Sequence, residues 1–113
     1  MQGILTEAEM EIEVNSADEN GKTPLMDAVH EGNEELVYGL LEIGANVNAQ
    51  AKNGLTALMI AAMLGRKSIV LMLLQAHANP HLTAGGMRAS RFAEQAGHQD
   101  ISRLLQTTEA KPW

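Results

Sequence analysis

The chain has 113 residues, 45% of them apolar, with only one Trp, one Tyr and one Phe. This length suits one domain with one core, which Leu, Ile, Val, Ala and the seven Met residues must fill. The absence of Cys excludes disulfides, thiolate catalysis and zinc held by thiolates. No apolar run approaches the roughly 20 residues that span a bilayer, and the first ten residues lack the pattern of a signal peptide.

The net charge of −6 is divided unevenly along the chain. Residues 1–50 contain 11 acidic residues and one base, whereas residues 51–113 contain 3 acidic residues and 7 bases. If the order of the chain is also its order in space, one end is acidic and can steer a basic partner toward it. The alternative is that the acidic residues only keep the protein soluble.

The first predicted pair of helices follows residue 23. Thr23 is a good N-cap, the next residue is a Pro that suits the first helical position, and Gly32 can end the helix. These signals predict a helix from Pro24 to Glu31. Two Glu residues and a run of apolar residues at helical spacing then predict a second helix that ends at Gly44. The two-residue link between them predicts an antiparallel pair.

Much of this pattern returns 33 residues later. The identical pairs are Gly21 and Gly54, Thr23 and Thr56, Leu25 and Leu58, Met26 and Met59, Ala28 and Ala61, Gly32 and Gly65, Leu40 and Leu73, Leu41 and Leu74, Ala45 and Ala78, Asn46 and Asn79. A degraded third copy follows at a spacing of 32, with Gly86, Ala93, Gly97, Ile101 and Leu105. A period between 20 and 50 residues indicates stacked supersecondary units.

Small and large apolar residues have different expected places in such a stack. The Ala residues of the first helices are expected where neighbouring helices approach closely, and the two Leu pairs are expected to form the continuous core between units. The Asn- and Gly-rich connectors "GANVNAQAKNG" and "AHANPHLTAGG" are expected to turn sharply and project beyond the helices.

The segment "GKTPLMDAVHEGNEELVYGLLEIGANVNAQ" and its second copy resemble the ankyrin repeat family. The resemblance extends from about Glu13 to Gln106 and implies an all-α solenoid of stacked helix-turn-helix units with projecting β-turn connectors. Met26 and Met59 stand where the family usually has a His that braces the turn, so packing is expected to replace its hydrogen bonds. Residues 88–91 depart from the Thr-Pro-Leu-His pattern, and their polarity fits a C-terminal cap.

The resemblance implies one domain with five parts. These are a partial N-terminal cap over residues 1–17, repeat 1 over 18–50, repeat 2 over 51–82, a degenerate capping repeat over 83–106, and a tail over 107–113. Residues 4–10 would form only the latter part of a preceding helix, so an upstream half-repeat is expected to be missing. The expected location is the cytoplasm, or the bacterial periplasm if a signal peptide has been removed ahead of Met1.

The resemblance also implies binding of a partner protein on the concave face formed by first helices and connector tips. The positions that usually make contact hold Glu19, Asn20, Lys22, Asp27, His30 and Glu31 in the first unit, Lys52, Asn53, Leu55, Met63 and Leu64 in the second, and Gly85, Met87 and Gln95 in the third. Their apolar members are expected to form a centre inside a polar rim. The alternative is that Met63 and Leu64 turn into the interface with the third unit.

Catalysis and metal binding are not expected. His30 lies near Asp27 and Glu31, but no nucleophile is placed beside it. His77 and His81 are four residues apart, yet they fall in a connector without a carboxylate ligand.

Nucleic-acid binding is also not expected. Arg88, Arg91 and Arg103 form a small basic patch without aromatic partners in an acidic chain. His98 follows Gly97 as in the family, so its expected role is to cap the second helix of the third unit.

The sequence therefore predicts a monomeric, non-catalytic protein-protein interaction module. No cofactor, metal, nucleic acid or membrane is expected, and the partner is another protein. The alternative is a stoichiometric inhibitor or immunity-type protein, as among small bacterial ankyrin proteins, that blocks a partner enzyme with a basic surface.

Overall fold

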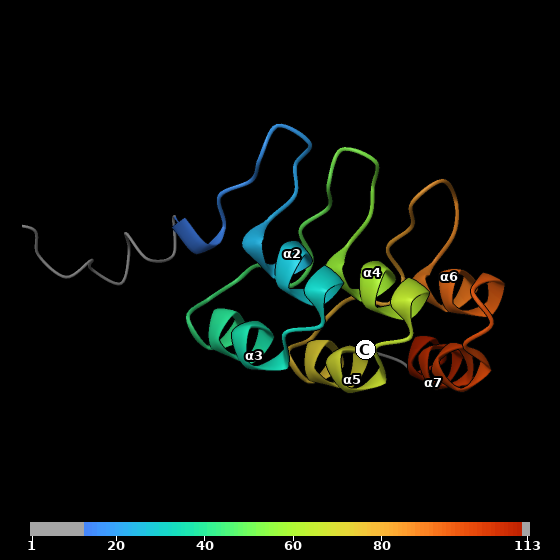
Figure 1. The fold of residues 1–113 in the computed structure, drawn as a ribbon. Coiled ribbons are helices and arrows are strands. Elements are labelled where there is room, and N and C mark those ends of the chain that lie inside the picture. Colours follow the sequence, from blue (N-terminus) through green and yellow to red (C-terminus); the bar gives the residue numbers. More distant parts are fainter. Residues whose placement is uncertain (1–12, 112–113) are drawn as a thin grey trace, which may run out of the picture.

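The computed structural model describes residues 13–111, which contain the end of a helix at Glu13 and Val14, six complete helices and no β-sheet. The helices are α2 (Pro24–Glu31), α3 (Glu34–Glu42), α4 (Ala57–Leu64), α5 (Lys67–Gln75), α6 (Ala89–Gln95) and α7 (Gln99–Glu109). One layer contains α2, α4 and α6, the other contains α3, α5 and α7, and the connecting loops project from the side of the first layer (Figure 1). The predicted all-α stack of helix-turn-helix units is confirmed. The half-helix predicted over residues 4–10 lies outside the described residues.

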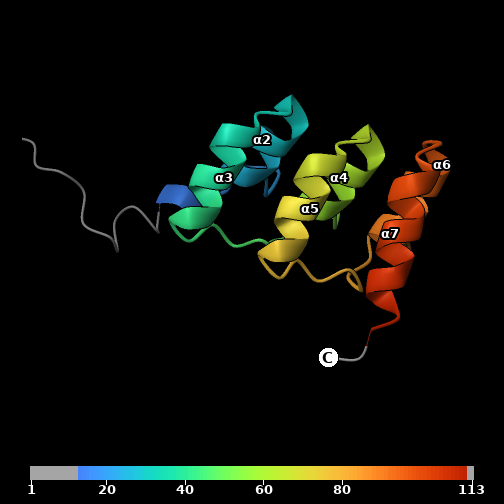
Figure 2. The same ribbon diagram turned by 90° about the horizontal axis from the view of Figure 1, so that it is seen from below.

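The three helix pairs follow one another in space as they do in the sequence. Seen from below, they lie side by side (Figure 2), with α2 packed against α4 and α4 against α6. Sequence order is therefore spatial order, and the acidic first unit lies at one end of the stack. None of the helices within residues 13–111 is both long enough and apolar enough to cross a membrane.

The ends of the first helices follow the sequence signals. Thr23 caps α2, since its side chain accepts a 3.3 Å hydrogen bond from the Met26 amide. Gly32 has a φ of 75° and ends the helix in the left-handed conformation. The prediction of a helix from Pro24 to Glu31 is confirmed. The same two devices act at Thr56 and Gly65 of α4.

The core runs through all three units and is made of aliphatic residues and Met. The fully buried large residues include Leu25, Met26, Leu58, Met59, Ile69, Leu73, Ile101 and Leu105. Packing at Met26 and Met59, expected in place of the family's His, is confirmed because each is only 1% exposed. The prediction for the Leu pairs is half right, because Leu40 and Leu73 are buried whereas their neighbours 41 and 74 are only partly buried. The second Leu of each pair packs against the core while part of its side chain stays exposed.

Successive units are also joined through the glycines that end the first helices. A Cβ on Gly65 would lie 2.6 Å from Cε1 of His98, so the His98 ring packs on that glycine. His98 stands at the N-cap of α7, the position predicted for it, although its side chain makes no capping hydrogen bond. At the equivalent place one unit earlier, Arg66 covers Gly32 and donates a 2.8 Å hydrogen bond to the carbonyl oxygen of His30.

Hydrogen bonds tie the three loops into one row. The Asn46 amide donates to Oδ1 of Asn15 at 2.6 Å, and the Asn79 amide donates to Oδ1 of Asn48 at 2.7 Å. The Lys52 amide donates to the Asn20 carbonyl oxygen at 3.0 Å. Each loop is thereby held by its neighbour, so the surface that the loops present is fixed before any partner arrives.

The third loop is one residue shorter at its tip. The first two loops are closed by backbone bonds between residues four apart, such as Ala51 to Leu55 at 2.9 Å. In the third loop the bond joins Ala84 and Met87, three residues apart, at 3.0 Å. The missing residue therefore lies between Ala84 and Met87, and its loss changes the repeat spacing from 33 to 32.

Candidate partner-binding surface

The predicted concave face consists of α2, α4, α6 and the loop before each of them. Of the residues predicted to contact a partner, the exposed ones are Glu19, Asn20, Asp27, His30, Glu31, Lys52, Asn53, Leu64, Gly85 and Gln95, and the partly buried ones are Lys22, Leu55, Met63 and Met87. None of them is fully buried. Each is therefore available to a partner, and their roles in binding remain predictions.

A groove between the first and second units brings five of these residues together. Its volume is about 160 Å³, and it is lined by Lys22, Met26, His30, Ala51, Asn53, Leu55, Ile60 and Met63. We call it the α2/α4 groove. Its apolar residues come from α2, α4 and the second loop, and its polar residues stand on α2 and the first two loops.

Three residues of the groove were not predicted. Met26 was assigned to packing alone, and it is 1% exposed although it reaches the groove floor. Ala51 and Ile60 are also buried, at 8% and 7% exposure. Ile60 stands 33 residues after the predicted contact residue Asp27, so extending that prediction by one repeat would have identified Ile60.

The predicted apolar centre is only partly assembled. Leu55 and Met63 both line the groove, whereas Leu64 and Met87 do not. Leu64 is 42% exposed at the end of α4. Met63 packs partly against the core while it lines the groove. Two of the four predicted apolar contact residues, Leu55 and Met63, therefore meet between the first two units.

The charges beside the groove are mostly acidic and lie on α2 and its loop. Lys22, in the groove wall, forms an ion pair with Asp27 at 3.7 Å, and both side chains are well exposed. Glu31 lies one turn further along the helix from Asp27, on the same face. In contrast, α4 carries no charged residue. Of the residues that line the groove, Lys22 is the formally charged one, whereas Asp27 and Glu31 lie beside the groove on α2 and helix α4 is uncharged.

The first loop is fixed by a carboxylate. Oδ1 of Asp18 accepts hydrogen bonds from the amides of Asn20 at 2.8 Å and Lys22 at 2.9 Å. The Lys22 amide, followed by the Asn20 amide, holds the pKa of Asp18 below its usual value, because both bonds favour the ionised form. The backbone of the first loop, beside the groove, is therefore held by hydrogen bonds to the ionised carboxylate of Asp18.

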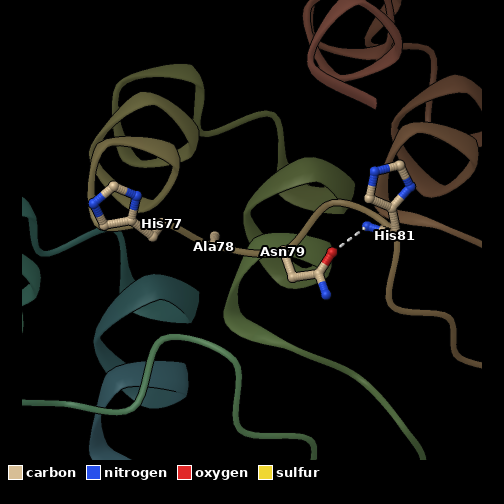
Figure 3. Close-up of a pocket in the computed structure, with 4 residues that line it drawn as sticks. All are labelled: His77, Ala78, Asn79 and His81. Carbon is tan, nitrogen blue, oxygen red and sulfur yellow. Dashed lines mark hydrogen bonds between the residues drawn. The ribbon is translucent and has the colours of Figure 1, made fainter. Parts of the chain in front are cut away.

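His77 and His81 lie apart in the third loop, between α5 and α6. The rings of His77 and His81 lie on opposite sides of Asn79, whose Oδ1 accepts a 2.9 Å bond from the His81 amide (Figure 3). They border a hollow of about 370 Å³. Within residues 13–111, no group of three or more His, Asp or Glu residues could hold a metal ion. His77 has a φ of 69°, where the first unit has Gly44.

The arginine patch is largely neutralised by carboxylates. Arg91 forms an ion pair with Glu94 at 2.8 Å, and Arg88 forms one with Glu109 at 3.4 Å. Paired guanidinium groups offer less net charge to a phosphate backbone.

The surroundings of His30 in the groove offer no hydroxyl or thiol nucleophile. The eight residues that line the α2/α4 groove include no Ser, Thr or Cys.

A second hollow, about 210 Å³, lies on the opposite layer between α3 and α5. Tyr38, Leu41 and Met72 contribute its apolar lining. Tyr38 is 60% exposed, and Leu71, which stands 33 residues later, is 44% exposed. Sequence reasoning treated the second helices only as core, although an aromatic residue and a Leu at the same repeat position indicated this exposed row.

Two family models match the chain. Residues 43–113 match a model described as ankyrin repeats in three copies, and residues 20–52 match the single ankyrin repeat. Together they cover the whole helical stack. No curated protein sequence matches the chain. Ankyrin repeats are generally non-catalytic protein-protein interaction modules, and they typically bind another protein.

Proposed function

Because the chain belongs to the ankyrin repeat family, we propose that it is a non-catalytic module that binds a partner protein on its concave face. The observation that carries the proposal is the α2/α4 groove, which gathers Lys22, His30, Asn53, Leu55 and Met63 from two units. Apolar residues within a polar rim are the usual anatomy of an interface. The hydrogen bonds between loops support this role, since a preformed surface loses little entropy when it binds.

The experiment compares the two layers of the stack. Peptides are selected from a random library on the immobilised protein, synthesised, and titrated against Leu55→Asp and Met63→Glu. The matched control is Leu71→Asp, which places the same charge on an exposed Leu of α5. Circular dichroism checks that each variant is folded.

A central apolar contact usually dominates an interface, so each groove variant should weaken binding at least about tenfold. The control should stay within about twofold of the parent. Selected peptides that bind both folded groove variants as tightly as the parent would remove the concave face as the binding surface.

The second candidate function is stoichiometric inhibition of an enzyme with a basic surface. The observation that favours it is the pair of exposed acids Asp27 and Glu31 on α2, the helix that borders the groove. An enzyme partner identified by affinity purification should lose activity at a one-to-one ratio. Binding without loss of activity would leave the interaction module and exclude the inhibitor.

A further inference from the structure

We infer that the α2/α4 groove takes one apolar side chain of a partner segment, of the size of Leu, Met or Phe, with Lys or Arg beside it over α2. This inference rests on the proposed function, because it names the partner chemistry of that same face. The experiments below separate the failure of one from the failure of the other.

The volume of the groove sets the size of the apolar group. An apolar cavity of about 150 Å³ accepts one benzene molecule, and the α2/α4 groove has about 160 Å³. One Leu, Met or Phe side chain fits this space. The flexible Met26 and Met63 in its lining can adapt to any of these shapes.

The composition of the lining determines what that group must be. Five of the eight lining residues are apolar, and three of these, Met26, Ala51 and Ile60, are buried. A polar side chain placed against them would lose its bonds to water without gaining partners. An aliphatic or aromatic side chain instead removes the exposed parts of Leu55 and Met63 from water.

The charges place the flanking residues of the segment. The first loop and α2 carry four acids, Asp18, Glu19, Asp27 and Glu31. Three bases stand near them, namely Lys22, which is paired with Asp27, Lys52, which attracts Asp18, and Arg66, which donates to the His30 carbonyl oxygen, so the acids remain in slight excess. Helix α4 carries no charge, and it ends in the exposed Leu64. Basic residues are therefore favoured on the α2 side, and uncharged residues are favoured on the α4 side.

The probes are synthetic 12-residue peptides with one central Leu. One peptide has two Arg residues before the Leu and another has them after it, because the direction of the segment is open. Two matched peptides replace the Leu with Ala or both Arg residues with Glu. Binding is measured by fluorescence anisotropy, and the Met methyl signals are followed by NMR up to millimolar peptide.

One of the two Leu-Arg peptides should bind and shift the methyl signals of Met26 and Met63. The Leu-to-Ala change should weaken binding about tenfold, and the Arg-to-Glu change should weaken it more at low salt than at high salt. On the protein, Asp27→Asn and Glu31→Gln should each weaken binding about two- to fivefold. Glu42→Gln on α3, an exposed acid outside the groove, is the matched control and should leave binding unchanged.

The inference is overturned if neither peptide shifts the methyl signals, or if the Ala and Glu peptides bind as well as the Leu-Arg peptides. If library-selected peptides then lose binding to Leu55→Asp but share no apolar-basic pattern, the proposed function stands without this inference. If selected peptides bind the folded groove variants unchanged, the proposed function falls with it.

Discussion

Helices α2 and α4 have the same length and the same capping residues, but they carry different side chains between their ends. Both have eight residues, both are capped by a Thr, and both end at a left-handed Gly, with φ of 75° and 72°. Between these ends, α2 holds the exposed Asp27, His30 and Glu31, where α4 holds the buried Ile60, the partly buried Met63 and the exposed Leu64. The residues that set the backbone are repeated, whereas those at these three positions differ.

This difference explains how a repeat fold acquires a specific surface. Burying Ala28 on α2 or Ala61 on α4 gives the same close helix packing, and both are at most 1% exposed. A groove between a helix that carries acids and a helix without charge arises only because adjacent units differ at these three positions. Stability therefore resides in what the units share, and recognition is proposed to reside in what they do not share.

The largest expected effect comes from a core residue shared by the units. Leu73 is fully buried, so Leu73→Ala should lower the free energy of unfolding by about 2 to 5 kcal/mol, as cavity formation does. Leu41 is only partly buried, and Leu41→Ala should cost less than about 2 kcal/mol. Urea unfolding followed by circular dichroism measures both. Equal losses would mean that the two Leu residues of each pair share the core evenly.

The helix bounds and the repeat register could be predicted from the sequence, because capping residues and backbone preferences near each helix end determine them. Thr23, Pro24 and Gly32 set the first helix by capping and by backbone preference, and the 33-residue register places the other units. The burial difference between Leu40 and Leu41 could not be predicted, since adjacent apolar residues differ only in the angle at which they leave the helix.

The site was predicted as a stripe but not as a groove. The repeat register predicted that Lys22, Leu55 and Met63 lie on one surface, because equivalent residues of successive units lie side by side in a stack. The register did not predict that Met26 lines the groove or that the His98 ring packs on Gly65. Such contacts depend on the side-chain conformations at the interface between two units. The sequence of a single repeat therefore does not predict which side chains of the next unit it contacts.

The next expected effect tests the contact between units two and three. Gly65→Ala would strain a φ of 72° and also press on His98, whereas Gly97 has a φ of 87° and open space around it. The left-handed conformation costs a residue with a Cβ about 1 to 2 kcal/mol. Gly97→Ala should lose about that amount, and Gly65→Ala should lose about 1 kcal/mol more, the cost of a displaced rotamer.

The double variant Gly65→Ala, His98→Ala provides the control. Removing the ring should abolish the extra loss in a double-mutant cycle of urea unfolding. If the two Gly variants lose the same free energy, His98 moves away freely and does not join the units.

A smaller gain is expected where the second unit departs from the first. His77 adopts a φ of 69° at the position of Gly44, which has a φ of 100°. His77→Gly relieves that strain but gives the unfolded chain more freedom, so the net gain should be about 0.5 kcal/mol. The control Ala76→Gly, at a φ of −88°, should instead lower stability by about 0.5 to 1 kcal/mol. Thermal unfolding of both variants measures the difference.

The smallest expected effect is a local response to acid that distinguishes the first loop from the second. Asp18 accepts bonds from two amides, and the same repeat position in the second loop holds Ala51, which cannot titrate. Because the folded pKa of Asp18 lies below its usual value, its contribution is present above that value and is lost as the pH falls through the folded pKa. Hydrogen exchange of the Lys22 amide should therefore lose protection only as the pH falls below the usual pKa of an Asp and through the lower folded pKa of Asp18, while the Leu55 amide, bonded to Oδ1 of Asn53 at 3.1 Å, should not. Asp18→Asn should remove the pH dependence at Lys22, and loss of protection at both amides together would instead indicate global acid unfolding.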